Sequence, residues 1–112
     1  MTTTPKLWKG LTQVNTTDGG EYQSDGQIVG LNDGGYIVVW ADWGDAYNPD
    51  GAAIVGQRYN AFGNKVGGEV ELSQFDSGSQ FSPAVTRLSN GNIAVAFVDN
   101  FKADSIVVGQ AI

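Results

Sequence analysis

The polar loop at residues 41–51, with the sequence ADWGDAYNPDG, holds the side chains best suited to bind a ligand. An aromatic ring in this loop suits stacking on a pyranose sugar, because aromatic side chains combine an apolar face with a polar edge. The loop carboxylates and amide can hydrogen-bond to sugar hydroxyls. We therefore expect a glycan site formed by Trp43, Tyr47, Asp42, Asp45, Asn48 and Arg58. The alternative is a solvated loop whose aromatic rings fold back or contribute to an interface.

Metal binding and catalysis have weaker support. Asp45 and Asp50 are candidate Ca²⁺ ligands, but the loop departs from the Asp-x-Asp-x-Asp-Gly pattern of a loop-wrapped calcium site. We therefore expect no cofactor and keep calcium as an alternative. The sequence has no cysteine and no histidine, which removes thiol nucleophiles, imidazole bases and the usual zinc ligands. Two loop carboxylates could serve a glycosidase, yet no nucleophile-and-base arrangement accompanies them, so we expect no enzyme.

The composition fits one all-β domain. Its 112 residues suit a single domain, 41% hydrophobic residues supply a core, and 16 glycines indicate many turns. The net charge of −6, without a basic cluster, disfavours nucleic acid and anionic membranes as partners. No apolar run has membrane-spanning length, and the first residues lack the apolar region of a classical signal peptide. We expect no membrane insertion, and an extracellular, cell-surface or virion location.

Two segments repeat one another at an offset of 57 residues. LNDGGYIVVW at residues 31–40 matches LSNGNIAVAF at residues 88–97, and Gln23 matches Gln80. In each copy an Asp-Gly or Asn-Gly pair predicts a hairpin with a type I′ turn, in which both central residues have positive φ. The strand after each turn is apolar on both faces, so we expect both faces to be covered.

The match continues into further strands. IVGQRY at residues 54–59 matches VVGQAI at 107–112 with an offset of 53, and GLTQVN at 10–15 matches GEVELS at 68–73 with an offset of 58. These patterns predict four-stranded meanders of propeller-blade size. The expected strands are 27–31, 35–42, 53–60 and 66–73 in a first blade (residues 27–73), and 84–88, 92–99 and 106–112 in a second blade (residues 84–112).

The second blade lacks an outer strand, while a matching strand precedes the first blade at residues 8–15. Two blades cannot close a ring, since known propellers have about four to eight. We therefore expect a two-blade β-propeller module at residues 8–112, after a tail at residues 1–7, whose ring closes by homo-oligomerisation with exchange of strand 8–15. A trimer is favoured, with a dimer or a tetramer as the alternative.

The apolar strands also define an expected core. An isolated chain is expected to expose sheet faces carrying Val38, Trp40, Val95 and Phe97, so we place these side chains between blades. A Gln repeated within an apolar strand is expected to satisfy backbone groups between blades. The expected core residues are therefore Trp40, Phe97, Val38, Val95, Gln57 and Gln110. For Arg58, the 12 acidic residues favour pairing with a carboxylate of the next blade over sugar binding.

The segments DGGYIVVW, IVGQRYNAFGNKVGGE and VNTT resemble a repeat of large secreted bacterial RTX-type adhesins. The resemblance spans nearly all of residues 8–112 and is stronger in the first copy; in the second, Phe97 replaces Trp and Ala111 stands where Arg58 stands. In organisation, although not in sequence, the chain resembles small bacterial propeller lectins, whose two-blade chains trimerise and bind sugars between blades. Neither resemblance by itself assigns an activity.

Taken together, these features predict a non-enzymatic, oligomeric binding module that recognises a polysaccharide or glycoconjugate on a bacterial or phage surface. The alternative is a structural protein, such as a virion decoration, a capsid-associated protein or a surface-layer component, that binds a capsid or surface protein rather than sugar.

Overall fold

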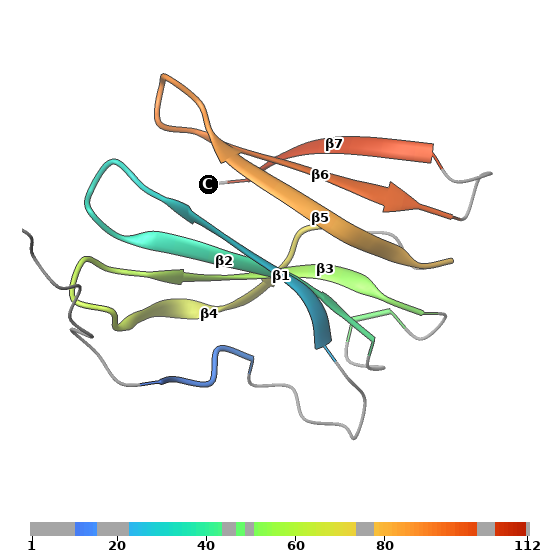
Figure 1. Cartoon of the computed structure of the whole chain (residues 1–112), viewed down its shortest axis with the longest axis horizontal. Coiled ribbons are helices and arrows are strands. Elements are labelled where there is room, and N and C mark those ends of the chain that lie inside the picture. The colour runs from blue at the N-terminus through green and yellow to red at the C-terminus, as the bar shows by residue number, and fades with distance from the viewer. Residues whose placement is uncertain are drawn as a thin grey trace, which may run out of the picture.

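The computed structural model of the chain is all-β, as expected, with two antiparallel sheets (Figure 1). It describes residues 11–15, 23–43, 47–48, 51–73 and 78–100, and the backbone of residues 105–111. The first sheet has the order β1-β2-β3-β4, formed by Gln23–Gly30, Tyr36–Asp42, Ala53–Tyr59 and Lys65–Glu71. The second has the order β5-β6-β7, formed by Gln80–Arg87, Ile93–Asp99 and Ser105–Ala111. Nowhere in these ranges is there a helix that could cross a membrane.

The two sheets repeat one another down to a backbone irregularity in their first strands. The register with the next strand shifts between Ser24 and Gln27 in β1, and at the matching place in β5. Within these shifts Asp25 and Ser82, which are 57 residues apart, have φ angles of 60° and 53°. Positive φ is uncommon outside glycine, so its recurrence marks a bulge that belongs to the repeat rather than to either strand alone. The bulge interrupts the alternation of side chains, which is why β1 and β5 begin four residues before the expected starts at 27 and 84.

The hairpin turns differ from the expected type I′ geometry. In the first hairpin the Gly34 N–H donates to Leu31 O at 3.2 Å and the Leu31 N–H donates to Gly35 O at 2.8 Å. Gly34 has a φ of 87°, and Asp33 is not among the residues with positive φ. This is the pattern of a type I turn followed by a left-handed glycine that forms a G1 bulge. Such a loop also accommodates the right-handed twist of the two strands. The second hairpin has the same geometry, with Gly91 at a φ of 89°.

The two faces of β2 have different environments, as its doubly apolar sequence predicts. Ile37, Val39 and Ala41 belong to a core cluster that lies between the sheets. Trp40 lies on the opposite face, in a smaller cluster with Val38 packed against it. Trp40 is only 4% exposed, so both faces of this strand make apolar contacts.

The two sheets pack head to tail: the face that β2 turns toward the second sheet is not the repeat equivalent of the face that β6 turns toward the first. The first sheet contributes Ile37, Val39 and Ala41, and the second contributes Ile93, Val95 and Phe97. The repeat aligns this second set with positions 36, 38 and 40, on the other face of the first sheet. Contrary to the expectation for an isolated chain, Val95 and Phe97 are only 2% and 4% exposed, because the first sheet covers them.

The segment before the first sheet does not form the expected strand within its described residues, Leu11–Asn15. It lies beside the Trp40 face instead, where Val14 packs against the Trp40 cluster. The Asn15 Nδ2 group donates a hydrogen bond to Gln23 Oε1 at 3.0 Å. The tail at residues 1–7 and the first part of the expected strand, at 8–10, lie outside the described residues.

The core position of Phe97 gives a first prediction. Phe97→Ala should lower the free energy of unfolding by about 3–5 kcal/mol, because it leaves a cavity between the sheets. The matched control is Phe62→Ala in the turn before β4, where the ring is 79% exposed and the cost should stay within about 0.5 kcal/mol. Urea denaturation followed by circular dichroism measures both. Equal losses for the two variants would contradict the placement of Phe97.

Candidate functional site

Trp43, the first aromatic of the expected glycan site, faces the core between the sheets. Its ring centroid lies 6.4 Å from that of Phe81, with an interplanar angle of 26°. The indole Nε1–H donates a hydrogen bond to Ser24 Oγ at 3.1 Å. The indole is therefore engaged by both sheets, and its packing face is not a free platform for a sugar.

Tyr47, the second aromatic, lies on the opposite side of the first sheet. Its ring packs against the Trp40 cluster, and its hydroxyl donates to Glu69 Oε1 at 2.9 Å. Burial is the main cause that raises the pKa of the Tyr47 phenol, and the hydrogen bond to the Glu69 carboxylate adds to it. The structure thus separates Trp43 from Tyr47 instead of bringing them together in one binding surface.

Asp42, a further expected ligand, is fully buried at the end of β2. It lies opposite Gln23 in the strand register, as Asp99 lies opposite Gln80 in the second sheet. In the second pair the Gln80 Nε2 group donates to Asp99 Oδ1 at 3.3 Å. A strand-paired Gln and Asp thus recur in both sheets, with the Asp buried each time, which explains Asp42 without a ligand.

Asn48 is also fully buried, and it joins the loop to the second sheet. Its Nδ2 lies 2.9 Å from both Ala52 O and Gly78 O, and 3.2 Å from Gln80 Oε1. The neighbouring backbone reinforces this link, because the Gln80 N–H donates to Ala52 O at 2.9 Å. The described part of the loop after β2 therefore ties the two sheets together.

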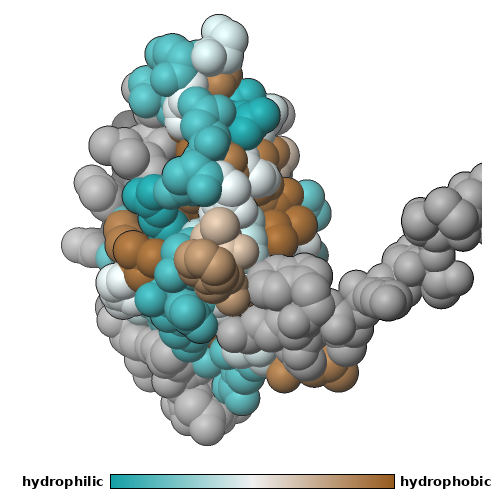
Figure 2. Space-filling view, turned by 90° about the vertical axis from the view of Figure 1, so that its left-hand side faces the viewer, coloured by the Kyte–Doolittle hydropathy of each residue, from teal (hydrophilic) through white to brown (hydrophobic). Residues whose placement is uncertain are grey.

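Arg58 lies at the other end of the first sheet. Its Nη2 is 2.8 Å from Asp33 Oδ2, so the expected pairing with a carboxylate occurs, although within its own sheet rather than with the next blade. The Gly35 N–H and then the Arg58 guanidinium hold the pKa of the Asp33 carboxyl below its usual value. Both side chains are solvent-exposed, so water screens the pair and its contribution to stability is small. Figure 2 looks onto this end of the molecule, where hydrophobic atoms are visible among polar ones.

The Gln57 side chain hydrogen-bonds to backbone carbonyls, as expected, but these lie within its own sheet rather than between blades. It is 1% exposed, and its Nε2 donates to Arg58 O and Gly67 O, both at 3.1 Å. These carbonyls lie beside the register shift between β3 and β4, where Gly67 has a φ of 70°. The amide thus hydrogen-bonds to backbone carbonyls beside this irregularity. The side chain of its repeat, Gln110, lies outside the described residues, as do Asp45 and Asp50.

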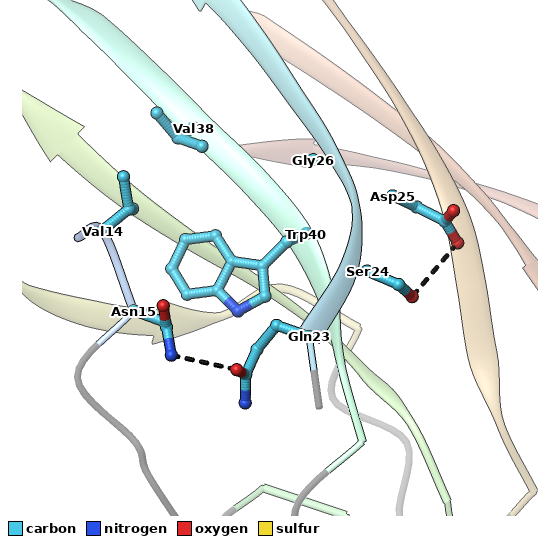
Figure 3. A pocket seen from close by; sticks show the side chains of 8 residues that line it. All are labelled: Val14, Asn15, Gln23, Ser24, Asp25, Gly26, Val38 and Trp40. Atoms are coloured by element: carbon cyan, nitrogen blue, oxygen red, sulfur yellow. Dashed lines mark hydrogen bonds between the residues drawn. The ribbon is translucent and has the colours of Figure 1, made fainter. Parts of the chain in front are cut away.

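A cavity of about 310 Å³ lies beside Trp40 (Figure 3). The indole ring lies between the segment carrying Val14 and Asn15 and the strand carrying Gln23. Within the described ranges the buried Trp40 Nε1–H has no hydrogen-bond partner. The full lining is Val14, Asn15, Gln23, Ser24, Asp25, Gly26, Val38 and Trp40.

Most of these lining residues were not predicted as a site, because their types alone carry no recognisable chemistry. The available signal was the repeat of Gln23 at Gln80, which marks both positions as parts of the same element. Metal ligands do not gather here or elsewhere in the described ranges, since these contain no group of three candidate ligand residues. What the cavity offers is an apolar wall with hydrogen-bonding groups at its rim.

Comparisons of the chain with known protein families, curated proteins and solved structures gave no match. The function must therefore be inferred from the geometry of the two sheets.

The Tyr47–Glu69 contact gives a second prediction. The folded-state pKa of Tyr47 lies above the unfolded value of about 10, so the stabilisation is complete below that pH and is lost as the pH rises above it. Tyr47→Phe should therefore lose less stability than the wild type between neutral pH and about pH 11. Glu69→Gln is the matched control, because it keeps an acceptor and removes the charge, and should fall between the two. Urea denaturation across this range tests it; identical pH profiles for all three proteins would contradict it.

Proposed function

We propose that this chain is a non-enzymatic, self-assembling structural module that supplies two blades to a β-propeller ring. Three copies would give six blades, and residues 8–15 of each copy would add the outer strand to the second blade of its neighbour. The ring would serve at a bacterial or phage surface by binding a surface or capsid protein. The resemblance to RTX-type adhesin repeats supports this setting.

The observation that carries the proposal is the head-to-tail packing of the two sheets. The interface within the chain joins two different faces of the repeat, and such a heterologous contact leaves an unused copy of each face at the two ends. Repeating the contact between chains generates a closed ring or an open filament. A ring covers both end faces, and the exchanged strand covers the open edge of β7, an edge that otherwise favours aggregation.

The choice of a structural role over glycan binding depends on the loop after β2. Trp43 contacts Phe81 and Tyr47 contacts the Trp40 cluster, so both rings already have apolar partners. Asn48 is occupied by three contacts, two of which, to Gly78 O and Gln80 Oε1, reach the start of the second sheet. These contacts favour an architectural use of the described part of the loop, and therefore a structural role over sugar binding.

Assembly gives a third prediction. Light scattering coupled to size-exclusion chromatography should give a mass of three times the chain's 11.8 kDa at micromolar concentration, falling on dilution. Deleting residues 1–15 should abolish the oligomer, whereas deleting only residues 1–7 should preserve it. A folded wild-type monomer at these concentrations would refute the ring, and an oligomer that survives the longer deletion would refute strand exchange.

Ligand preference gives a fourth prediction. A broad glycan array probed with the wild-type oligomer, with and without calcium, should show no binding. Trp43→Ala should instead destabilise the fold by about 1.5–3 kcal/mol, since the partly buried indole packs against the core between the sheets. A glycan bound by the wild type and lost in Trp43→Phe, which keeps most of the packing, would reverse the choice in favour of the lectin function.

A further inference from the structure

We infer that the cavity beside Trp40 is a half-site for a second copy of this chain, whose β6 face at positions 94, 96 and 98 packs across positions 36, 38 and 40. This inference depends on the proposed ring and names the two surfaces that form it. It makes the contact between chains a repeat of the contact within the chain.

The contact within the chain supplies the template. Val39 of β2 and Val95 of β6 belong to the same core cluster between the sheets. The repeat partner of Val39 is Ala96 and that of Val95 is Val38, so the equivalent pair at the next interface is Ala96 and Val38. In the same way Ile37 becomes Ala94. The transposed residues are all partly exposed, so they remain available for a partner.

The sizes of the transposed side chains support this pairing. On β6, Ala94 and Ala96 are smaller than their repeat partners Ile37 and Val39. On β2, Trp40 is larger than its partner Phe97, and likewise Tyr36 is larger than Ile93. Val98 is larger than its partner Ala41, so the β6 face loses volume on balance while the β2 face gains it. Apolar interfaces tolerate substitutions best when the total volume is kept. The smaller face therefore fits the larger one.

The cavity occupies the place where the second copy is required. Its lining residues Gln23, Val38 and Trp40 match Gln80, Val95 and Phe97, all of which are buried in the second sheet. In the second sheet these residues lie against the first sheet. On the first sheet the described residues leave a space of about 310 Å³ at the corresponding place (Figure 3). A second copy packed on this face would fill it with apolar side chains.

The segment before β1 already lies at the edge of this half-site. Val14 packs beside Trp40, as its repeat partner Leu72 packs against the cluster that contains Phe97. Leu72 and Ser73 also extend the edge of β3, because the Leu72 N–H donates to Ile54 O at 2.7 Å and Ser73 Oγ accepts from the Ile54 N–H at 3.1 Å. By the same repeat, residues 11–15 would extend the β7 edge of the second copy.

Cysteine cross-linking tests the pairing, because the chain has no cysteine of its own. Val38→Cys and Ala96→Cys chains are mixed and treated with a short bismaleimide. Mixed dimers should form at least about tenfold faster than from Ala96→Cys mixed with Val70→Cys, because an interface raises the local concentration of the two thiols. Val70 is a fair control because it is 56% exposed and lies, through the register Val39–Gly56–Val70, on the face opposite to Val38.

Three results would overturn the inference. A wild-type chain that is monomeric by light scattering removes the ring and the interface together. An oligomer in which the 38/96 mixture reacts no faster than the 70/96 control keeps the ring but refutes these faces. Rapid dimerisation of Val38→Cys alone shows a symmetric contact of two Trp40 faces, which is incompatible with a head-to-tail interface.

Discussion

The structure depends on one constraint: the central strand of each sheet is apolar on both faces. A sheet built around such a strand must be covered twice, since each large apolar side chain left in water costs about 1.5–3 kcal/mol. The second sheet satisfies the constraint for Ile37 and Val39 of the first. The opposite face, with Val38 and Trp40, is covered in part by Val14 and Tyr47 and still borders a cavity. The head-to-tail geometry of the chain follows from this demand, and the proposed ring extends it.

The loop after β2 shows how the same constraint decides the use of residues that look suited to ligand binding. Trp43 and Tyr47 are aromatic residues of the kind that stack on sugars, but each packs against a different face of the first sheet. Asn48 and the backbone of Ala52 hold the start of the second sheet in place. A fixed angle between the two sheets is what a ring of identical contacts requires, because small errors accumulate around it.

Side-chain alternation and the internal repeat were sufficient to predict the strands, their order and the two faces of β2. They could not show the first residues of β1 and β5, because Asp25 and Ser82 take left-handed backbone angles that break the alternation. They also gave the wrong turn type at Gly34 and could not show which way Trp43 points, since loop side chains follow no period. Residues 11–15 match a strand in sequence, but a strand needs a partner edge, and the single chain places them beside Trp40 instead.

The central claim is that a second copy continues the repeat, and amide hydrogen exchange at the β7 edge tests it most directly. In the described part of the single chain β7 pairs only with β6, so its outward N–H groups should exchange rapidly at low protein concentration. Assembly should protect these amides together with those of residues 11–15, and the protection should rise with concentration in parallel. Rapid exchange at both places under conditions in which the protein is fully oligomeric would contradict the claim.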